Sequence, residues 1–297
     1  MDLIKRLPEG IKYLENEPMS RHTTFRTGGP ADLMLLPSSL SELRETLAAL
    51  RAEGVRPFIL GNGSNLLVSD KGIRGIVVKL GEGLDEISAQ GETVVCGAGA
   101  FLTRLCVFAA ENSLSGAEAL YGIPGSVGGA VYMNAGAYGS EIKDILVSAD
   151  YIDADGETGT LEGVEGYGYR RSPFTDSDRI ITAAVFAFSN GDRAEIEAKM
   201  AEIKARRSDK QPLNYPSAGS VFKRPEGYYA AALIDRAGLK GTTVGGARVS
   251  EKHAGFIVNV GGATTADITR LIEIVKERVF KDSGVELETE VRFVGEK

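Results

Sequence analysis

The sequence predicts an α+β protein made of two parts that meet near residue 190. Short apolar runs typical of strands and amphipathic stretches typical of helices both occur along the chain. A turn cluster, Ser189-Asn-Gly-Asp192, marks a change from β-like runs to longer, more charged helices. The length of 297 residues is enough for two or three domains of ordinary size.

The expected elements of the first part include a helix at residues 41–54, where Leu43, Leu47 and Leu50 share one face and Gly54 supplies the end. A second helix is expected from Phe101 to Asn112. Strands are expected at residues 57–60, 66–69, 76–80, 93–96, 150–153 and 180–188.

The second part opens with a charged helix at residues 193–207 that places Ile196, Met200 and Ile203 on one face. The clearest helix of the chain spans residues 265–282, because its apolar residues recur at helical spacing and Gly284 follows its end. The other expected elements are a helix at residues 228–237 and strands at 256–260 and 285–294.

The composition excludes several functional classes. A net charge of −7 provides no general attraction for nucleic acid or anionic lipid, so an anionic substrate must be bound by local arginines. With two cysteines and two histidines in all, we expect no Cys/His metal site. We expect Cys96 and Cys106 to be reduced core thiols, with a buried disulfide between them as the alternative. Neither a signal peptide nor a run of about 20 apolar residues is found, so we expect no membrane segment.

The most unusual stretch runs from Tyr121 to Gly139, with six glycines among 19 residues and no charged residue. Glycine weakens helices and strands unless the backbone needs a positive φ or a very close approach. Main-chain amides turned inward can bind an anion without a basic side chain. We therefore interpret this stretch as one wall of a site for a flat or anionic ligand. The alternative is a loop that only connects two elements.

A second glycine loop, Gly61-Asn-Gly-Ser-Asn-Leu66, begins like a dinucleotide-binding fingerprint but has Leu66 in place of the third glycine. A β-like run follows it instead of a helix, so the Rossmann interpretation fails. No Gly-Lys-Ser/Thr ending occurs, which also excludes a P-loop. Two glycine loops in one domain suit a long ligand with a diphosphate and an aromatic ring.

An ordered set of motifs runs through nearly the whole chain. The first motifs are Thr24-Phe-Arg-Thr-Gly-Gly29, Gly61-Asn-Gly-Ser-Asn65, Ile123-Pro-Gly-Ser-Val-Gly-Gly129 and Asn134-Ala-Gly-Ala-Tyr138. The later motifs are Gly168-Tyr-Arg-Arg-Ser172, Ala218-Gly-Ser-Val-Phe-Lys223 and Leu287-Glu-Thr-Glu-Val-Arg292. In these motifs and in their order, the chain resembles the UDP-N-acetylenolpyruvoylglucosamine reductase family. The short stretch from Ile180 to Lys210 leaves no room for the insertion of one family branch, so the chain resembles the shorter second type.

The resemblance implies a two-lobed FAD-binding domain of the vanillyl-alcohol-oxidase (PCMH) type at residues 1–190, with its subdomains divided near residue 70. A C-terminal α+β substrate-binding domain at 191–297 is implied, whose last strand contributes to the active site. FAD is expected to be bound non-covalently, although His22 lies near the first flavin motif. The implied cofactor-binding residues are Gly61, Asn62, Gly63, Ser64, Asn65, Ile123, Pro124, Gly125, Ser126, Gly128, Gly129, Asn134, Gly136, Ala137 and Tyr138.

The family reaction implies that NADPH reduces the flavin, which then gives hydride to C3 of the enolpyruvyl group of a UDP-sugar, yielding UDP-N-acetylmuramate. Such a site needs a cation beside the carboxylate and a proton donor near C2. The resemblance assigns Arg170 as the cation, Ser220 as the proton donor and Glu290 as the group that assists proton transfer. Outside the motifs these would be read as a surface arginine, a turn serine and a solvated carboxylate.

Basic residues around the motifs are candidates for binding the diphosphate of the substrate. Lys223, Arg224 and Arg292 flank Ser220 and Glu290 and are the substrate-binding residues that we expect. Arg224 stands where other family members have Asn. No catalytic role is expected for His253, and no metal is expected.

Two other functional classes compete with this interpretation. A flavin oxidase of the same fold would act on another substrate and react quickly with oxygen. A non-catalytic nucleotide-binding protein would keep the glycine loops but would not need the Ser220 and Glu290 motifs. For the reductase we expect a cytoplasmic enzyme of peptidoglycan synthesis that is a monomer and that binds neither nucleic acid nor membrane.

Overall fold

The computed structural model describes residues 4–296, and the chain folds into two compact units that interleave in sequence. The first unit comprises the residues up to Leu14 together with Leu33–Asn62 and Ile76–Ala205. The second unit comprises Glu15–Asp32, Gly63–Gly75 and the residues from Arg206 onward. The chain therefore passes between the units several times. A point of division falls within each of strands β1 (Lys12–Pro18), β2 (Pro30–Leu36) and β5 (Ile73–Lys79) and within helix α4 (Arg193–Lys210).

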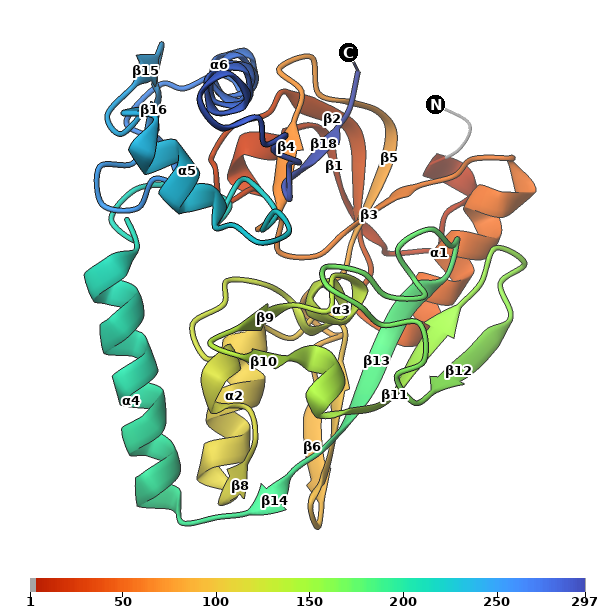
Figure 1. Ribbon diagram of the computed structural model, residues 1–297. Helices are drawn as coiled ribbons and strands as arrows, with labels where there is room; N and C mark the ends of the chain where they lie inside the picture. Colours follow the sequence, from red (N-terminus) through yellow and green to blue (C-terminus); the bar gives the residue numbers. More distant parts are fainter. Residues whose placement is uncertain (1–3, 297) are drawn as a thin grey trace. The chain divides into compact units, whose positions relative to one another are not determined.

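A five-stranded antiparallel sheet forms the centre of the first unit, in the order β12-β11-β13-β7-β6 (Figure 1). Its strands are β6 (Ile87–Gln90), β7 (Thr93–Gly97), β11 (Leu146–Ile152), β12 (Thr158–Glu162) and β13 (Ile180–Ala187). Helix α3 (Val127–Tyr132) packs against β13 and β7, and helix α2 (Leu102–Glu111) packs against α3.

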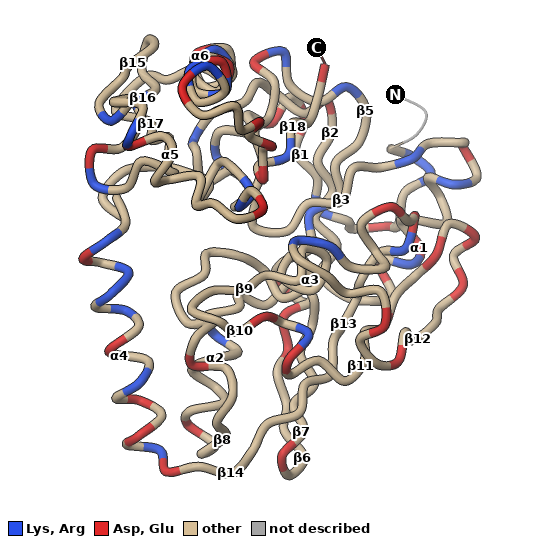
Figure 2. Tube along the Cα trace, in the orientation of Figure 1, with Lys and Arg blue, Asp and Glu red and all other residues tan. Residues whose placement is uncertain are grey.

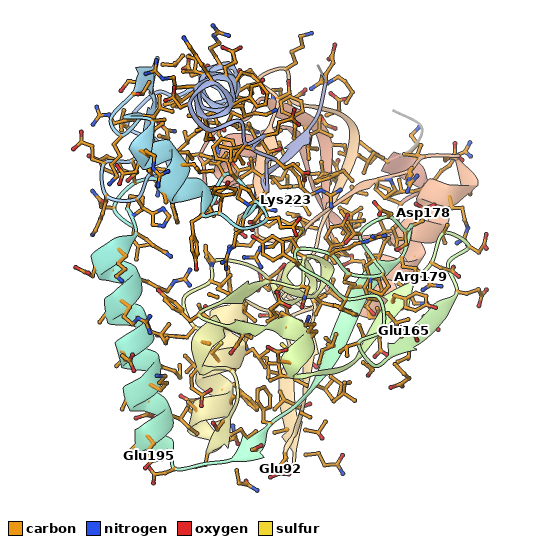
Figure 3. All side chains as sticks on the ribbon, in the orientation of Figure 1. Glu92, Glu165, Asp178, Arg179, Glu195 and Lys223 are labelled. Carbon is orange, nitrogen blue, oxygen red and sulfur yellow. The ribbon has the colours of Figure 1, made fainter. Side chains whose placement is uncertain are left out.

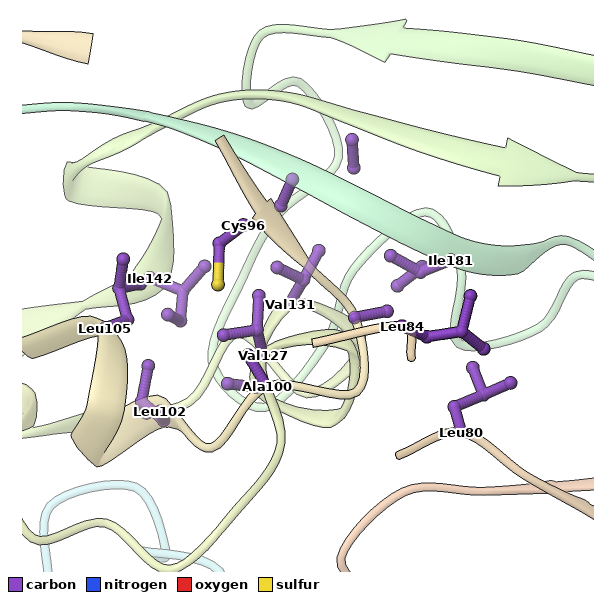
Figure 4. Packing of buried hydrophobic residues seen from close by; sticks show 14 of the residues in the cluster. Leu80, Leu84, Cys96, Ala100, Leu102, Leu105, Val127, Val131, Ile142 and Ile181 are labelled. Atoms are coloured by element: carbon purple, nitrogen blue, oxygen red, sulfur yellow. The ribbon is translucent and has the colours of Figure 1, made fainter. Parts of the chain in front are cut away.

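The core of the first unit lies between this sheet and these helices (Figure 4). Leu102, Leu105, Val127 and Val131 are fully buried there, and Cys96 of β7 contributes its sulfur to the same cluster. Full burial of a Val or Leu side chain stabilises a fold by about 1.5–3 kcal/mol. The helical spacing of Leu102 and Leu105 and the extended alternation of β7 thus place their apolar residues in one core.

Four strands form a further sheet in the order β1-β2-β5-β3, and in it β3 runs parallel to β5. Helix α1 (Leu40–Ala52) buries Leu43, Leu47 and Leu50, as the sequence predicts. It begins after Ser39, whose hydroxyl accepts a hydrogen bond from the amide of Glu42. The strands are β1 (Lys12–Pro18), β2 (Pro30–Leu36), β3 (Phe58–Leu60) and β5 (Ile73–Lys79).

The second unit has a three-stranded antiparallel sheet, β15-β16-β17, whose core includes residues of α6 (Thr265–Ser283) and α5 (Ala230–Arg236). Thr264 and Asp267 form a reciprocal capping box at the start of α6, and Gly284 ends the helix with a φ of 70°. The other strands of this unit are β4 (Leu66–Val68), β15 (Thr243–Val244), β16 (Ala247–Val249), β17 (Ile257–Asn259) and β18 (Arg292–Val294), and β18 pairs in parallel with β4.

The remaining elements are short, apart from helix α4 (Arg193–Lys210). Lys, Arg, Asp and Glu alternate along α4 (Figure 2), and its buried residues are mainly those on the predicted face, Ile196, Met200 and Ile203. The short strands are β8 (Leu114–Ser115), β9 (Gly136–Ala137), β10 (Ser140–Glu141) and β14 (Ser189–Asn190). The 3-10 helices are Ile4–Arg6, Met19–Arg21, Glu118–Leu120 and Ile142–Asp144.

The last predicted strand is much shorter in the structure than in the prediction. The expected strand at residues 285–294 is reduced to β18, which begins only at Arg292. Before it, Thr289 forms an isolated bridge with Phe222, and the amide of Glu290 donates to the carbonyl of Val221. These residues pair with a loop and not with a strand, so no regular alternation exists at Glu286, Glu288 and Glu290.

Three features of the described residues bear on function. Between residues 4 and 296, no helix is both long enough and apolar enough to cross a membrane. In the same range, no cluster of three or more His, Cys, Asp or Glu side chains could hold a metal ion. Cys96 and Cys106 are buried free thiols, and burial raises the pKa of each to about 12. The structure therefore has the thiol alternative and not the disulfide.

Candidate functional site

Arg170 lies at the tip of a tight turn in the first unit. The amides and carbonyls of Gly168 and Arg171 exchange two hydrogen bonds of 3.0 and 3.1 Å, which close the turn around Tyr169 and Arg170. Arg170 has a φ of 55°, in the left-handed region that normally favours Gly or Asn. That conformation costs an L-residue about 1–2 kcal/mol, so the surrounding structure must hold it. Strain of this kind is concentrated at functional sites.

Two contacts hold the Arg170 side chain. Its Nη2 atom donates to the carbonyl of Gly136 at 3.2 Å, and its guanidinium lies 5.0 Å from the centre of the Tyr169 ring. Gly136 belongs to the glycine-rich stretch 121–139, so this stretch and the arginine turn are in direct contact. Arg171, by contrast, is exposed and lies 3.8 Å from the carboxylate of Asp176. The two adjacent arginines therefore differ in their contacts: Arg170 contacts the glycine-rich stretch, whereas Arg171 is exposed beside Asp176.

Asn134 supports the same turn through its side chain. It is fully buried, and its Nδ2 atom donates to the carbonyl of Gly168 at 2.9 Å and to the carboxylate of Glu141 at 3.0 Å. Its Oδ1 atom accepts from the amide of Lys143 at 3.0 Å. All these partners are protein groups, so the Asn134 side chain serves as a structural link between the glycine-rich stretch and the Arg170 turn.

Ser220 and Glu290 lie on neighbouring segments of the second unit. Ser220 pairs with Phe256 in an isolated bridge, and the amide of the next residue, Val221, donates to Gly255. The carbonyl of Val221 accepts a 2.7 Å hydrogen bond from the amide of Glu290. The backbone of Val221 therefore connects the predicted proton donor to the predicted carboxylate.

The predicted substrate-binding cations belong to the same unit and lie close to this pair in sequence. Lys223 donates to the carboxylate of Glu288 at 3.0 Å, and the Glu288 side chain is largely exposed while that of Lys223 is partly exposed (Lys223 is labelled in Figure 3). An exposed ion pair contributes at most about 1 kcal/mol, so Lys223 can exchange Glu288 for an anionic ligand at small cost. The guanidinium of Arg224 lies over the ring of Tyr229, 4.0 Å from its centre. Arg292 is exposed at the first position of β18.

The first glycine loop has main-chain amides that the protein leaves unused. Among the described residues, no hydrogen-bond acceptor for the amides of Asn62, Gly63 and Ser64 is found. Gly63 has a φ of 59°, and a Cβ atom there would lie 2.0 Å from the carbonyl oxygen of His22, so only glycine fits. Unbonded amides in a glycine loop form the kind of concave donor site that binds a phosphate.

The second glycine-rich stretch is used differently. The amides of Val127 and Gly128 donate to Ala100 and Ala98, and that of Gly129 donates to the hydroxyl of Ser126 at 3.3 Å. A Cβ atom on Gly128 would lie 2.8 Å from that of Ala98, so glycine is needed here for packing. The predicted residues of this stretch fall on the approach to α3 (Ile123, Pro124, Gly125), at its N-cap and first turn (Ser126, Gly128, Gly129), and around β9 (Gly136, Ala137, Tyr138).

The two histidines lie in separate settings of the second unit. The Nε2 atom of His22 lies 2.9 Å from the carboxylate of Glu17. His253 packs edge-on against Phe256 with ring centres 4.9 Å apart, and its Nδ1 accepts from the amide of Gly255. Burial lowers the pKa of His253. Phe256 is paired with Ser220, so His253 supports the serine segment, a contact that no motif in the sequence signals.

Comparisons with known proteins match two separate regions of the chain. Residues 31–162 match the model of an FAD binding domain. Residues 211–294 match that of the UDP-N-acetylenolpyruvoylglucosamine reductase C-terminal domain. A protein of that name from Caldanaerobacter subterraneus is 49% identical over 98% of this chain and 96% of its own length. One from Agathobacter rectalis is 50% identical over the same shares.

The chain belongs to the UDP-N-acetylenolpyruvoylglucosamine reductase family. A solved structure of the reductase from Thermus caldophilus superposes with a TM-score of 0.81 at 34% identity, covering 95% of this chain and 98% of that one. Phl p 4.0202, a glucose dehydrogenase, has a TM-score of 0.50 at 15% identity over 64% of this chain and 44% of its own, which concerns the fold alone.

Membership of the UDP-N-acetylenolpyruvoylglucosamine reductase family and the matched FAD-binding domain together identify the class of enzyme. The protein is a flavoprotein oxidoreductase of peptidoglycan precursor synthesis, with an FAD-binding domain of the PCMH type and a separate C-terminal domain. Both predicted glycine segments lie inside the matched FAD domain, while Ser220 and Glu290 lie inside the C-terminal domain. Arg170 lies between the two matched regions.

Proposed function

We propose that this protein reduces UDP-N-acetylglucosamine enolpyruvate to UDP-N-acetylmuramate at the expense of NADPH, in the cytoplasm and as a monomer. The observation that carries the proposal is the backbone connection between Ser220 and Glu290 through Val221. It brings a hydroxyl-bearing residue and a carboxylate-bearing residue together in a family whose reaction requires a proton donor. Residues 1–190 are the proposed FAD-binding part, and residues 191–297 the proposed substrate-binding part.

Non-covalent FAD supplies the hydride chemistry of the reaction when it is bound. The unbonded amides of Asn62, Gly63 and Ser64 support a role for this loop in holding its diphosphate. The stretch from Ile123 to Gly129 is proposed to support the cofactor through close backbone packing, because the amides of Ile123, Gly125, Val127, Gly128 and Gly129 donate within the protein. Gly136, Ala137 and Tyr138 complete the proposed cofactor-binding set, and Asn134 acts by fixing the neighbouring Arg170 turn.

Arg170 is the proposed cation for the carboxylate of the enolpyruvyl group. Its planar guanidinium can hold a carboxylate through two parallel hydrogen bonds, and it stays charged at every working pH. Negative charge grows on this carboxylate as the double bond is reduced, so a fixed cation stabilises the transition state more than the ground state. The strained but well-supported backbone of Arg170 is consistent with a preorganised group.

Ser220 is the proposed proton donor to C2, and Glu290 the group that assists the transfer. Reduction of the C2–C3 double bond forms one C–H bond at each carbon, so C2 must gain a proton that the hydride donor does not supply. A serine hydroxyl is a weak acid, and neighbouring groups must stabilise the alkoxide that remains. Lys223 is a nearby cation in sequence, and with Arg224 and Arg292 it is also proposed to bind the substrate diphosphate.

The proposal is tested by following the flavin absorbance without oxygen. NADPH should bleach the purified yellow protein, and UDP-N-acetylglucosamine enolpyruvate should then restore the colour with one UDP-N-acetylmuramate formed per flavin. If NADPH reduces the flavin but the sugar nucleotide never reoxidises it, the proposed substrate is wrong. Fast reoxidation by oxygen alone would favour an oxidase of the same fold, and colourless protein would rule out both flavoenzyme interpretations.

A further inference from the structure

Asn65 is hydrogen-bonded through its side chain and its main chain to the segment that contains Glu290. Its side-chain Nδ2 atom donates to the carbonyl of Glu290 at 3.1 Å. Its main-chain carbonyl accepts from the amide of Arg292 at 2.9 Å. The parallel pairing of β4 with β18 begins at the next residue, where Leu66 lies opposite Arg292. The glycine loop and the carboxylate segment are therefore joined directly, although 225 residues separate them in sequence.

Glu290 is consequently fixed through both of its main-chain polar groups. Its amide donates to Val221, the residue after Ser220, at 2.7 Å, and its carbonyl accepts from Asn65. Glu290 lies outside β18, so no strand ladder holds it in place. These two bonds define the position from which its side chain extends.

The side-chain amide of Asn65 is thus bonded to Glu290, whereas the main-chain amides of the three preceding residues have no acceptor among the described residues. The Asn65 side chain makes a 3.1 Å bond to protein, while the main-chain amides of Asn62, Gly63 and Ser64 have no acceptor among the described residues. Within one short loop, the main-chain amides are therefore available to bind an anion, while the side chain of the last residue, Asn65, bonds to the segment that contains Glu290. The sequence motif predicts Asn65 only as a cofactor-binding residue. It does not distinguish anion binding by the main chain from the bond between the Asn65 side chain and Glu290.

We propose that Asn65 is a positioning residue for Glu290. Through this bond, the first glycine loop, residues 61–65, sets the position of Glu290 for proton transfer to C2. The inference rests on the proposed role of Glu290 in proton transfer to C2. Asn65 acts only through Glu290, so its loss should slow the reoxidation of flavin by the sugar nucleotide while leaving flavin reduction by NADPH intact. One neutral hydrogen bond corresponds to a change of about 3- to 10-fold in that rate.

The experiment is a double-mutant cycle that measures both half-reactions per bound flavin. Asn65→Ala, Glu290→Gln and the combined variant are compared with the wild type in anaerobic stopped-flow, first with NADPH and then with the sugar nucleotide. We expect Asn65→Ala to slow reoxidation about 3- to 10-fold on its own and to have no further effect when Glu290→Gln is present. Asn65→Asp, which keeps the shape but removes the donor, should reproduce the selective loss if the alanine variant does not fold.

Asn259 provides the matched control. It is a buried asparagine of the same unit whose Nδ2 atom donates to the carbonyl of Phe25 at 3.0 Å. Its Oδ1 atom accepts from the amides of Gly261 and Ala263, so its side-chain partners lie outside the Glu290 segment. Asn259→Ala should lower the melting temperature without separating the two half-reactions. A structural role for Asn65 would produce that same pattern and would overturn the proposal.

Other outcomes are equally decisive. If the effects of Asn65→Ala and Glu290→Gln simply multiply, Asn65 does not act through Glu290. If Asn65→Ala loses flavin but reoxidises normally per bound flavin, Asn65 is a cofactor-binding residue and the inference is wrong. If Glu290→Gln alone leaves reoxidation unchanged, the proposed role of Glu290 fails first, and the inference falls with it.

Discussion

The Nδ2 atom of Asn134 donates a 2.9 Å hydrogen bond to the carbonyl of Gly168, two residues before Arg170. This bond reaches from the end of the glycine-rich stretch to the turn that holds the proposed carboxylate-binding arginine. Asn134 is fully buried, and its three side-chain bonds all go to protein. The left-handed backbone of Arg170 is therefore supported by a residue that no single sequence feature would select for this task.

Replacing Asn134 by Ala should destabilise the protein and loosen the Arg170 turn together. The change leaves the amide of Lys143 without its buried acceptor and removes one of the two donors to the carbonyl of Gly168, which costs about 1–3 kcal/mol. We expect a lower unfolding free energy in denaturant titration and a weaker apparent affinity for the sugar nucleotide. An unchanged affinity in a protein of reduced stability would show that the turn keeps its geometry without Asn134.

Arg170→Lys should damage the second half-reaction even though the positive charge is kept. Lysine presents a point charge and lacks the planar fork that can bind both carboxylate oxygens. We expect reoxidation of flavin by the sugar nucleotide to slow by about 10²- to 10³-fold, as for the loss of one preorganised donor to a developing anion. Reduction by NADPH is the internal reference. Arg171→Lys is the matched control, because Arg171 is exposed beside Asp176, and it should leave both rates near the wild-type values.

Ser220→Ala should separate the two half-reactions most clearly. The hydroxyl is needed only when C2 of the substrate gains its proton, so flavin reduction by NADPH should keep its rate. Loss of a positioned general acid costs about 10²- to 10⁴-fold in the step that needs it. Stopped-flow absorbance of the flavin measures both steps in one sample. Similar slowing of reduction and reoxidation would argue against Ser220 as the proton donor.

Strong periodic elements could be predicted from the sequence, and weak ones could not. Helix α6 was predictable because its apolar stripe, the Asp267 capping box and Gly284 all agree. Helix α3 was not, because two of its six residues, Gly128 and Gly129, are poor helix formers. It forms because Ser126 caps it and because Val127 and Val131 are buried in the core, and such tertiary packing overrides the low propensity of glycine.

The interleaving of the two units depends on contacts between distant residues. Asp70 accepts hydrogen bonds of 2.7 and 2.8 Å from the amides of Thr265 and Ala266 at the start of α6, which joins residues 63–75 to the second unit. Local sequence patterns contain no information on a pairing across 195 residues. The ordered motifs predict the candidate site residues, whereas the bonds that Asn134 and Asn65 make to Gly168 and Glu290 depend on the folded structure.

The two buried thiols should make the protein less stable at alkaline pH. Burial raises the pKa of Cys96 and Cys106 from 9.0 to about 12, because the thiolate is poorly solvated in the core. Below pH 9 both the folded and the unfolded chain keep these protons, so the stabilising contribution is fully present. Between pH 9 and 12 the unfolded chain releases protons that the folded chain retains, so the free energy of unfolding falls as the pH rises.

The size of this effect can be isolated with a variant that lacks both thiols. Each thiol contributes a slope of at most about 1.4 kcal/mol per pH unit, and only well above pH 9. Denaturant titrations at pH 8, 9.5 and 10.5 on the wild type and on a Cys96→Ala, Cys106→Ala double variant would give the difference in slope. Tyr167, whose pKa burial also raises to about 12, is present in both proteins and cancels in the comparison. Parallel curves for the two proteins would mean that the thiols ionise in the folded state as easily as in the unfolded chain.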